Sequence, residues 1–401
     1  MSRAEIEDVP AEKSNVSVGP SRSRADRKGE GNRRHRVAVV LNDMNAAGGI
    51  QRAAANLVRD LRTEFDTLVV TVYAPQDTVF RESEQVLKSL NLPYVHGKFY
   101  PRLREALVIG WRLRRLVADE NIDTVICIWY HVAVIAALAL PRSVKKIGYE
   151  HIAFAAATGI WARLRWWSYR RLDAVVSLTK EDHAQFAAIS KRARVIPNYV
   201  PLPASREPGK REKLLLAVGH IEYRKGLDRL LWALKEPLQA NPDWKLVFVG
   251  GGDIGHSQQW YVAYLHALTR MLHLANRVEL CAATHRIEEW YRRASIYVMG
   301  SRLEGFPMVL LEAKSHGLPV VSYDCPTGPK EIVRHGVDGF LIPNDLTAFA
   351  AAARALMDDD DLRRRMGEAA VEDIRLRFVA SRICPQWRDL IAAVHGEPAF
   401  G

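Results

Sequence analysis

The repeated alternation of short apolar runs with longer helical segments is the feature that most constrains the fold of this sequence. This pattern predicts parallel β-sheets with helices on both faces. The first run, Val37–Leu41, is continuously apolar, as a strand buried on both faces should be. In the first half we also expect strands at Thr67–Tyr73, Thr124–Tyr130, Lys146–Tyr149, Ala174–Leu178 and Val195–Pro197, with helices near Gln51–Leu61, Arg102–Ala118 and Ile160–Arg171.

A polar stretch with three prolines, Pro201–Lys213, interrupts this alternation, which restarts at Leu214–Val218. Such a stretch is typical of a domain boundary. We therefore expect two successive α/β domains, residues 36–200 and 214–378, joined by a linker at 201–213 and followed by a helix and tail at 379–401. The second series comprises Gly226–Leu238, Lys245–Val249, Gln258–Leu274, Val278–Cys281, Ile287–Arg293, Ile296–Met299, Val309–His316, Pro319–Ser322, Phe340–Ile342, Thr347–Met357, Leu362–Arg377 and Gln386–Val394.

Two segments bear on targeting and membrane insertion. Residues 1–35 are rich in Ser, Arg, Glu and Gly and lack an apolar h-region, so we expect a disordered tail rather than a secretory signal. Thr124–Pro141 contains no Asp, Glu, Lys or Arg and just reaches the length of a candidate spanning helix. Its first part is β-branched and aromatic and its second part is rich in alanine and leucine. We therefore interpret it as a buried strand followed by a buried helix, Val132–Leu140.

The charge of the chain is concentrated in its first half. The 401 residues carry a net charge of +11, of which residues 36–205, with 23 Lys/Arg against 15 Asp/Glu, contribute +8. A basic half-molecule predicts an anionic partner, which could be a nucleic acid, a phosphorylated substrate or an acidic membrane surface. Four cysteines with no CxxC pair argue against a zinc ribbon or a disulfide scaffold and favour a reducing compartment.

Two glycine-containing turns follow predicted strands. The first, with Gly48, Gly49 and Arg52, lies between a strand and a helix, where backbone N–H groups can face an anion. It matches neither GxGxxG nor the P-loop, so it is either an anion site or a tight turn without a ligand. The second, Gly219–Gly226, carries adjacent Arg224 and Lys225, which are either diphosphate ligands beyond the end of a strand or a solvated basic turn.

The segment Ser301–Ala313 carries two glutamates eight residues apart. Glu304 precedes a predicted helix and Glu312 lies within it, and Phe306-Pro307 fits the helix start. A carboxylate at this place can accept hydrogen bonds from sugar hydroxyls while the helix N–H groups face a phosphate. Without further context, one glutamate would be a helix cap and the other a surface residue.

Taken in order, these segments resemble the family 4 glycosyltransferases, which are retaining, metal-independent enzymes of the GT-B fold. The resemblance covers roughly residues 36–395. Its most specific part is Glu304–Glu312 with the residues that follow it, Gly317–Pro329 and Gly336–Gly339; Gly48–Arg52, Gly219–Gly226 and Gly250–Gly252 also match. The variant Cys325-Pro-Thr-Gly-Pro329 resembles bacterial members that build surface polysaccharides, glycolipids or lipid-linked oligosaccharides. The fold implied is two Rossmann-like domains facing a central cleft, with the C-terminal helix returning to the first domain.

The resemblance implies a role for each matched residue. Catalytic residues would be His151, in a Glu-His pair at a strand end, with Lys225 on the diphosphate and Glu304 on the sugar hydroxyls. Glu312 would bind the ribose, and Gly48, Gly49 and Arg52 would meet the acceptor. The family often has arginine where this chain has His220, and Arg224 could supply that charge. The full set of expected sugar-donor contacts is Gly49, Arg224, Lys225, Glu304, Gly305, Phe306, Pro307 and Glu312.

The resemblance also implies the reaction and its partners. A nucleotide sugar, with UDP favoured, would donate a sugar to a glycan or lipid-linked acceptor, with no cofactor, no metal and no nucleic-acid partner. Helices that mix tryptophan with arginine, Trp161–Arg171 and Arg102–Arg115, suit an anionic membrane interface, or are amphipathic helices with Trp in the core. We therefore expect a cytoplasmic enzyme at the inner face of the cell membrane. The alternatives are a GT-B nucleotide-sugar epimerase, a sugar phosphorylase and a basic nucleic-acid-binding protein.

Overall fold

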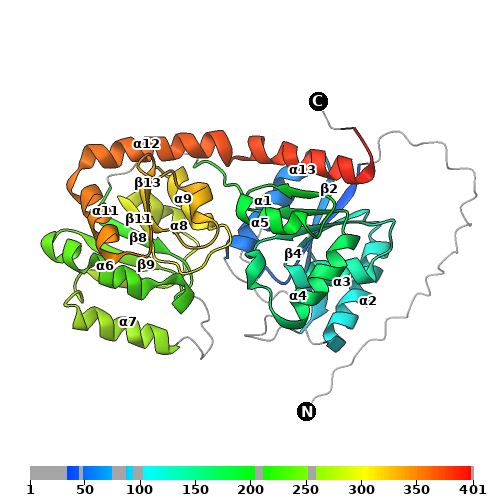
Figure 1. The fold of residues 1–401 in the computed structure, drawn as a ribbon, viewed down its shortest axis with the longest axis horizontal. Helices are drawn as coiled ribbons and strands as arrows, with labels where there is room; N and C mark the ends of the chain where they lie inside the picture. The colour runs from blue at the N-terminus through cyan, green and yellow to red at the C-terminus, as the bar shows by residue number, and fades with distance from the viewer. Residues whose placement is uncertain are drawn as a thin grey trace, which may run out of the picture. The chain divides into compact units, whose positions relative to one another are not determined.

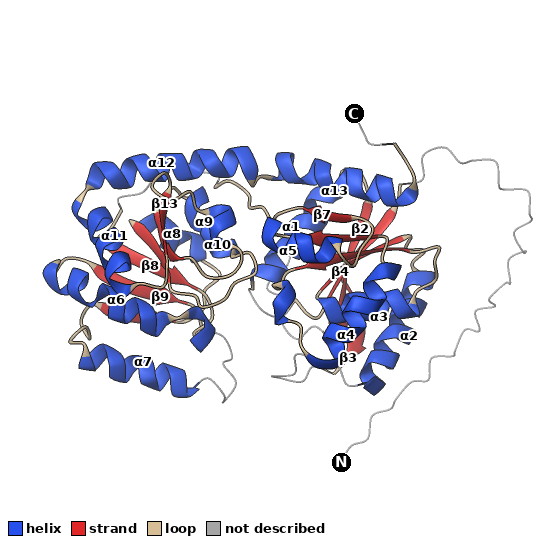
Figure 2. Ribbon diagram, viewed as in Figure 1, coloured by secondary structure: helices blue, strands red, loops and turns tan. Residues whose placement is uncertain are grey.

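Two all-parallel sheets with helices on both faces make up the chain from His35 onward (Figures 1 and 2). This computed structural model describes residues 34–44, 48–74, 87–93, 103–203, 211–251 and 259–398. The expected tail at 1–35 and linker at 201–213 lie largely outside these ranges, so both stay predictions. The predicted pair of Rossmann-like α/β units is confirmed.

The first sheet has seven strands in the order β3-β2-β1-β4-β5-β6-β7. Its strands are β1 Arg36–Leu41, β2 Asp66–Tyr73, β3 Leu87–Leu92, β4 Thr124–Ile128, β5 Lys145–Glu150, β6 Ala174–Ser177 and β7 Ala193–Val195; its helices are α1 Gly49–Leu61, α2 Leu103–Asp119, α3 Tyr130–Ala139, α4 Gly159–Ser168 and α5 Lys180–Ala187. The strand order reverses between β1 and β4, which pair in parallel with Val40 opposite Cys127. The carboxyl ends of β1, β4 and β5 therefore lie side by side.

The second sheet has six strands in the order β10-β9-β8-β11-β12-β13. Its strands are β8 Leu214–Val218, β9 Lys245–Val249, β10 Val278–Cys281, β11 Ile296–Met299, β12 Val320–Tyr323 and β13 Gly339–Ile342; the helices are α6 Leu227–Ala240, α7 Gln259–Met271, α8 Ile287–Arg293, α9 Met308–Ser315, α10 Pro329–Ile332, α11 Leu346–Asp358, α12 Asp360–Arg377 and α13 Ala380–His395. Here the order reverses between β8 and β11, so ligands are expected at their carboxyl ends.

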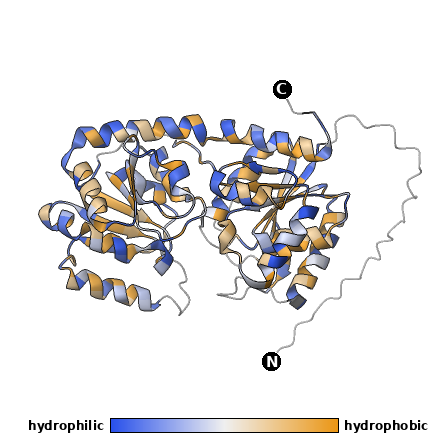
Figure 3. Ribbon diagram, in the orientation of Figure 1, coloured by the Kyte–Doolittle hydropathy of each residue, from blue (hydrophilic) through white to orange (hydrophobic). Residues whose placement is uncertain are grey.

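Burial follows the sequence pattern closely. Five of the six residues of β1 are buried, and α1 buries Ala53, Ala54, Leu57, Val58 and Leu61 along one face. Figure 3 shows the strands of both sheets as hydrophobic and the outer helices as mixed. No helix in the described ranges is both long and apolar enough to cross a membrane, and the uncharged stretch Thr124–Pro141 forms β4 and α3 as predicted.

The last helix, α13, returns to the first sheet as expected. It contacts α1, and its Trp387 and Ile391 are fully buried in the core that also holds Val37 and Val39 of β1. Figure 1 shows α13 beside α1. Burial of an indole and several aliphatic side chains, each worth roughly 1.5–3 kcal/mol, stabilises the packing of this helix on the first sheet.

Several details differ from the sequence prediction. The short helix α10 was not predicted, β7 ends at Val195 where the strand was predicted to begin, and α13 begins at Ala380 rather than at Gln386. The strand predicted to reach Tyr130 ends at Ile128, because Trp129 adopts φ +82° and Tyr130 begins α3. The edge strand β3 was not predicted, since its sequence LKSLNL is only half apolar. The polar helix α5 was also missed; its start is fixed by Thr179, whose hydroxyl accepts from the Asp182 N–H at 3.2 Å.

Candidate functional site

The Gly219–Gly226 turn follows β8 and the Ser301–Glu304 segment follows β11, so both lie at the reversal point of the second sheet. The two segments pack closely through their backbones, so a Cβ on Gly226 would collide with the carbonyl oxygen of Gly300. Gly226 also has φ +63°, which favours glycine. The sequence motif therefore builds a ligand-binding edge where an open parallel sheet is expected to have one.

Glu304 is the centre of a charged cluster on this edge. Its side chain is 7% exposed, and its Oε1 accepts from Lys225 Nζ at 2.7 Å and from Ser301 Oγ at 2.6 Å. The guanidinium of Arg224 lies 3.5 Å from Oε2. Three residues expected to contact the sugar donor, Arg224, Lys225 and Glu304, are thus brought together.

Glu304 stays ionised in this buried position. Burial acts to raise its pKa, but the charges of Lys225 and Arg224 and the hydrogen bonds from Lys225 and Ser301 outweigh it and lower the pKa. A carboxylate held this way can exchange its hydrogen bonds for those of sugar hydroxyls without first losing a proton.

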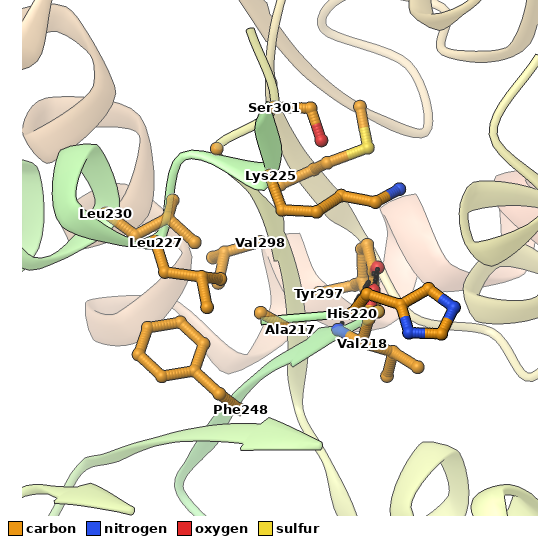
Figure 4. Close-up of a pocket in the computed structure, with 13 residues that line it drawn as sticks. Ala217, Val218, His220, Lys225, Leu227, Leu230, Phe248, Tyr297, Val298 and Ser301 are labelled. Carbon is orange, nitrogen blue, oxygen red and sulfur yellow. Dashed lines mark hydrogen bonds between the residues drawn. The ribbon is translucent and has the colours of Figure 1, made fainter. Parts of the chain in front are cut away.

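A pocket opens beside Lys225 (Figure 4). Figure 4 shows the Lys225 ammonium and the His220 imidazole on one side and Leu227, Leu230 and Phe248 on the other. His220, which stands where the family often has arginine, therefore lines the same pocket as Lys225.

The backbone of Glu304 is held by the Cys-Pro-Thr-Gly segment. Its N–H donates to the carbonyl of Pro326 at 3.0 Å, and the Thr327 N–H donates to its carbonyl at 3.1 Å. The Thr327 hydroxyl bonds to Gly305 O at 3.0 Å. The Cys325–Pro329 segment thus fixes the loop that presents Glu304.

His151 follows β5 and lies against the Glu304 loop. A Cβ on Gly305 would collide with the His151 carbonyl oxygen, so only glycine allows this approach. Burial lowers the pKa of His151 to about 3, which makes the imidazole neutral. Its Nε2 is buried and has no hydrogen-bond partner within the described part of the chain. A buried polar atom without a partner is costly, and a ligand hydroxyl would satisfy it.

Glu312 has partners from both α/β units. In α9, its Oε1 accepts from Arg52 Nη1 of α1 at 2.6 Å and its Oε2 accepts from the Tyr291 hydroxyl at 2.8 Å. Both carboxylate oxygens are therefore occupied. Arg52, expected to meet the acceptor, is bound to the residue expected to meet the ribose.

The glycine turn lies beside the start of α9, and Phe306 there is more buried than a ligand contact need be. A Cβ on Gly49 would lie 3.2 Å from the Met308 side chain, so this turn contacts the first residue of α9. Pro307 caps that helix. Phe306 is 6% exposed and packs against Phe378, which makes it a core residue as much as a ligand contact. Gly48 precedes α1, whereas Asn45–Ala47 and Gly252 lie outside the described residues.

The carboxyl edge of the first sheet holds residues that the sequence did not single out. Trp129 directly follows β4, and β4 lies in the sheet between β1, which precedes the glycine turn, and β5, which precedes His151. His131 bonds to Asn42 Oδ1 at 2.9 Å, and burial lowers its pKa to about 4. The half-buried indole of Trp129 packs against the cores on both sides of the sheet. Trp129 therefore lies between the glycine turn and His151.

Two further residues were missed for different reasons. Ser301 begins the Ser301–Ala313 segment. Its hydroxyl, three residues before Glu304, is the sequence feature that could have identified it. Tyr291, in α8, bonds to Glu312 from a helix remote in sequence. No local pattern marks it, because the contact is created by the packing of α8 beside α9.

Comparison with known families supports this arrangement. Residues 47–202 match the family model described as Glycosyltransferase Family 4, and residues 202–373 match the model described as Glycosyl transferases group 1. The two matches meet at the proline-rich stretch where the alternation restarts.

The chain is also similar to individual proteins. It is 26% identical over 370 residues to an uncharacterized glycosyltransferase of Haemophilus influenzae, covering 89% of this chain and 99% of that protein. It is 24% identical to a Campylobacter jejuni N-acetyl-D-galactosaminyltransferase whose name includes an undecaprenol-linked glycan, covering 90% and 99%. The Anabaena HepE structure, in complex with UDP and glucose, superposes with a TM-score of 0.75 at 18% identity, covering 89% and 99%.

Proposed function

Because the chain belongs to the glycosyltransferases that join a Family 4 domain to a group 1 domain, and has their GT-B fold, we propose that it transfers a sugar from a UDP-sugar to a glycan or lipid-linked glycan acceptor with retention of anomeric configuration. The observation that carries this proposal is the buried Lys225–Glu304–Ser301 cluster. The loop that holds it packs against the backbone of His151, whose Nε2 is buried and has no partner among the described residues. Homologues in bacterial polysaccharide and lipid-linked glycan synthesis support the acceptor class.

The reaction breaks the bond between the anomeric carbon and the diphosphate oxygen and forms a bond from that carbon to an acceptor hydroxyl oxygen. Negative charge develops on the departing diphosphate, and Lys225 and Arg224 stabilise it. In a retaining reaction without a protein nucleophile, the acceptor attacks from the face of the leaving group. The acceptor proton then passes to a diphosphate oxygen.

The protein groups then have separate tasks. Glu304 holds the sugar hydroxyls. His151 is neutral because of its low pKa and acts as a hydrogen-bonding residue rather than as a base at neutral pH. Glu312 holds the ribose, which requires at least one of its bonds to Arg52 and Tyr291 to be exchanged. The cations Lys225 and Arg224 do the charge neutralisation that a metal would otherwise do.

The acceptor approaches between the glycine turn and His151, where Trp129 lies. A half-buried indole in this place offers an apolar face to a sugar ring. Asn42 and His131 add polar groups behind it. We therefore propose a glycan acceptor whose terminal ring stacks on Trp129.

A membrane surface is the proposed location of the acceptor. On α2 the side chains of Leu107, Val108 and Trp111 are exposed, and on α4 Ile160, Trp166 and Trp167 are exposed. Arg170 and Arg171 lie over the rings of Trp166 and Trp167. Both helices pack against α3. Aromatic residues flanked by arginines suit the headgroup region of anionic lipids at the inner face of a cell membrane. Arg165 differs from its neighbours, because it is buried over Phe154.

Nucleotide release tests the reaction. Purified protein is incubated with UDP-, GDP-, ADP- and dTDP-sugars in the presence of a chelator, with and without a membrane lipid extract. Release from the UDP-sugars that increases with lipid, and product of retained configuration by NMR, are expected. A donor sugar converted without any acceptor would indicate an epimerase instead. Absence of both release and nucleotide binding would contradict the proposal.

Sedimentation with vesicles tests the location separately. The full chain should pellet with vesicles that contain anionic phosphatidylglycerol at low salt and should be released at high salt. The variant Trp166→Ser with Trp167→Ser should bind less. Failure of the wild-type protein to pellet would remove the membrane surface from the proposal while leaving the transfer reaction in place.

A further inference from the structure

A cluster of side chains that can bind a metal ion lies at the opposite edge of the first sheet from His151 and Trp129. His35 directly precedes β1, Asp123 directly precedes β4, and His395 is the last residue of α13. One ligand atom from each of these three residues lies within 4.8 Å of the others. The cluster is thus built from three distant parts of the chain, and none of its members belongs to the transfer site.

The distances within the cluster match those of a small coordination sphere. His35 Nδ1 is 3.1 Å from Asp123 Oδ2, and His395 Nε2 is 3.7 Å from Asp123 Oδ1. Two ligands bound tetrahedrally to zinc at its usual bond lengths lie about 3.4 Å apart. His395 Nε2 also bonds to the Thr124 hydroxyl at 2.7 Å, so a bound ion would replace this bond and draw together ligand atoms that lie within 4.8 Å of one another.

Glu397 lies on the far side of the His35 ring from Asp123, so each ring nitrogen of His35 faces a carboxylate. His35 Nε2 bonds to Glu397 Oε1 at 2.9 Å, while its Nδ1 faces Asp123. A metal-binding histidine commonly donates its second ring N–H to a carboxylate, which fixes the tautomer and the ring orientation. Gly396, at φ +82°, ends α13 and turns the chain so that Glu397 reaches His35.

The ligands are carried on rigid backbone and remain reachable from solvent. The carbonyls of His35 and Asp123 accept from Asp66 and Lys145 at 3.0 and 2.7 Å, which extends the sheet bonding to both residues. The side chains of His35, Asp123 and His395 are 24%, 36% and 12% exposed. The two imidazole rings stack with centroids 3.9 Å apart, which limits their movement.

We propose that His35, Asp123 and His395 bind a zinc ion whose fourth position is filled by water, with Glu397 orienting His35. Two imidazole nitrogens with one carboxylate are ligands that Zn²⁺ prefers, whereas Mg²⁺ and Ca²⁺ prefer oxygen ligands. The ion connects the end of α13 to the amino ends of β1 and β4. It thereby holds the returning helix to the first sheet and leaves the chemistry of transfer to other residues.

Zinc titration of the untagged full chain, after treatment with a chelator, tests this proposal by calorimetry. We expect one saturable equivalent of Zn²⁺, no comparable Mg²⁺ binding, and a rise in the thermal unfolding midpoint with zinc. His395→Ala should abolish the binding. Glu397→Gln should weaken it about 10- to 100-fold, the usual cost of removing a supporting carboxylate. His285→Ala, an exposed histidine of the second unit, is the matched control and should bind as wild type does.

Two outcomes would overturn the proposal. One is the absence of a saturable equivalent in the folded wild-type chain. The other is equal zinc affinity in wild type, Glu397→Gln and Asp123→Asn. These two variants keep the size of the side chain, so they test the site even if His395→Ala fails to fold. Cobalt substitution gives an independent readout, since the visible spectrum of bound Co²⁺ should change in Asp123→Asn and should not change in His285→Ala.

Discussion

The two sheet edges that form the proposed transfer site differ in electrostatic character. On the second sheet, Lys225, Arg224 and Glu304 are charged, and the pKa of Glu304 is lowered. On the first sheet, burial lowers the pKa of His151 to about 3 and raises that of Glu150 to about 7, so at pH 7 the imidazole is uncharged and the carboxyl is partly protonated. This contrast fits the proposed binding of a diphosphate at the second sheet, here called the charged edge, and of hydroxyls and a sugar ring at the first sheet, here called the neutral edge.

The largest effect is expected at the charged edge, from Glu304→Gln. Loss of a preorganised group of this kind costs about 10²–10³ in kcat. Nucleotide release in the presence of acceptor measures it, and Glu304→Ala should abolish transfer. Thermal unfolding shows whether the variant is folded. Near-wild-type turnover in a folded variant would remove Glu304 from the site and leave the edge without its organising carboxylate.

Lys225→Ala should lower kcat by about 10², since it removes the cation closest to the developing charge. Arg224→Ala is the matched control. Its side chain is 43% exposed and its guanidinium lies 3.5 Å from Glu304, against 2.7 Å for Lys225. We expect a smaller loss there, below about 10-fold, as for a screened surface charge. Equal losses in the two variants would mean that Arg224 contributes as much as Lys225.

The neutral edge is tested by pH. Burial raises the pKa of Glu150 to about 7 despite the charge of Arg165 and the hydrogen bond from Tyr169, so the native state keeps a proton that the unfolded state releases near 4.5. The native state therefore binds more protons between these values, and this group's stabilisation falls as pH rises from about 4.5 to about 7. Urea unfolding should show that fall, at most about 3 kcal/mol, in wild type and not in Glu150→Gln. Parallel pH profiles for the two proteins would show that Glu150 is ionised in the fold.

Trp129→Ala should raise the KM for a glycan acceptor by about 10-fold, the effect of losing roughly two buried methylene groups of apolar contact. Hydrolysis of the donor in the absence of acceptor should be unchanged, because Trp129 lies on the neutral edge. Trp129→Phe should keep the KM for the acceptor close to the wild-type value, because the aromatic face is retained. The control Trp232→Ala removes an exposed indole from α6. If the donor KM rises instead, Trp129 belongs to the sugar-donor site.

The smallest effect is expected where the edges are joined, at Arg52. Its bond to Glu312 must be exchanged when the ribose binds, so Arg52→Ala should tighten UDP binding about 5-fold, or about 1 kcal/mol. Calorimetry with UDP measures this change. Tyr291→Phe removes the other bond to Glu312 and is the matched comparison. Weaker UDP binding in Arg52→Ala would place the guanidinium among the nucleotide contacts.

The sequence allowed much of this to be predicted, for identifiable reasons. Continuous apolar strands such as β1 and amphipathic helices such as α1 are local patterns, and Lys225, Glu304 and Glu312 lie in motifs of fixed spacing. The strand β3 and the helix α5 escaped because one is a half-polar edge and the other depends on a cap. Tyr291, Trp129 and the pairing of Arg52 with Glu312 depend on the packing of distant segments, which no local pattern records.

The close approach of Gly305 to the carbonyl of His151 has a further consequence. With no side chain between them, the two loops touch through backbone atoms, and the distance from the glutamate to the histidine is set by the width of the chain itself. Gly305→Ala would act as a spacer of one methyl group. It would keep every side chain of the proposed site and would move Glu304 and His151 apart. Gly305 therefore sets the spacing between these two residues.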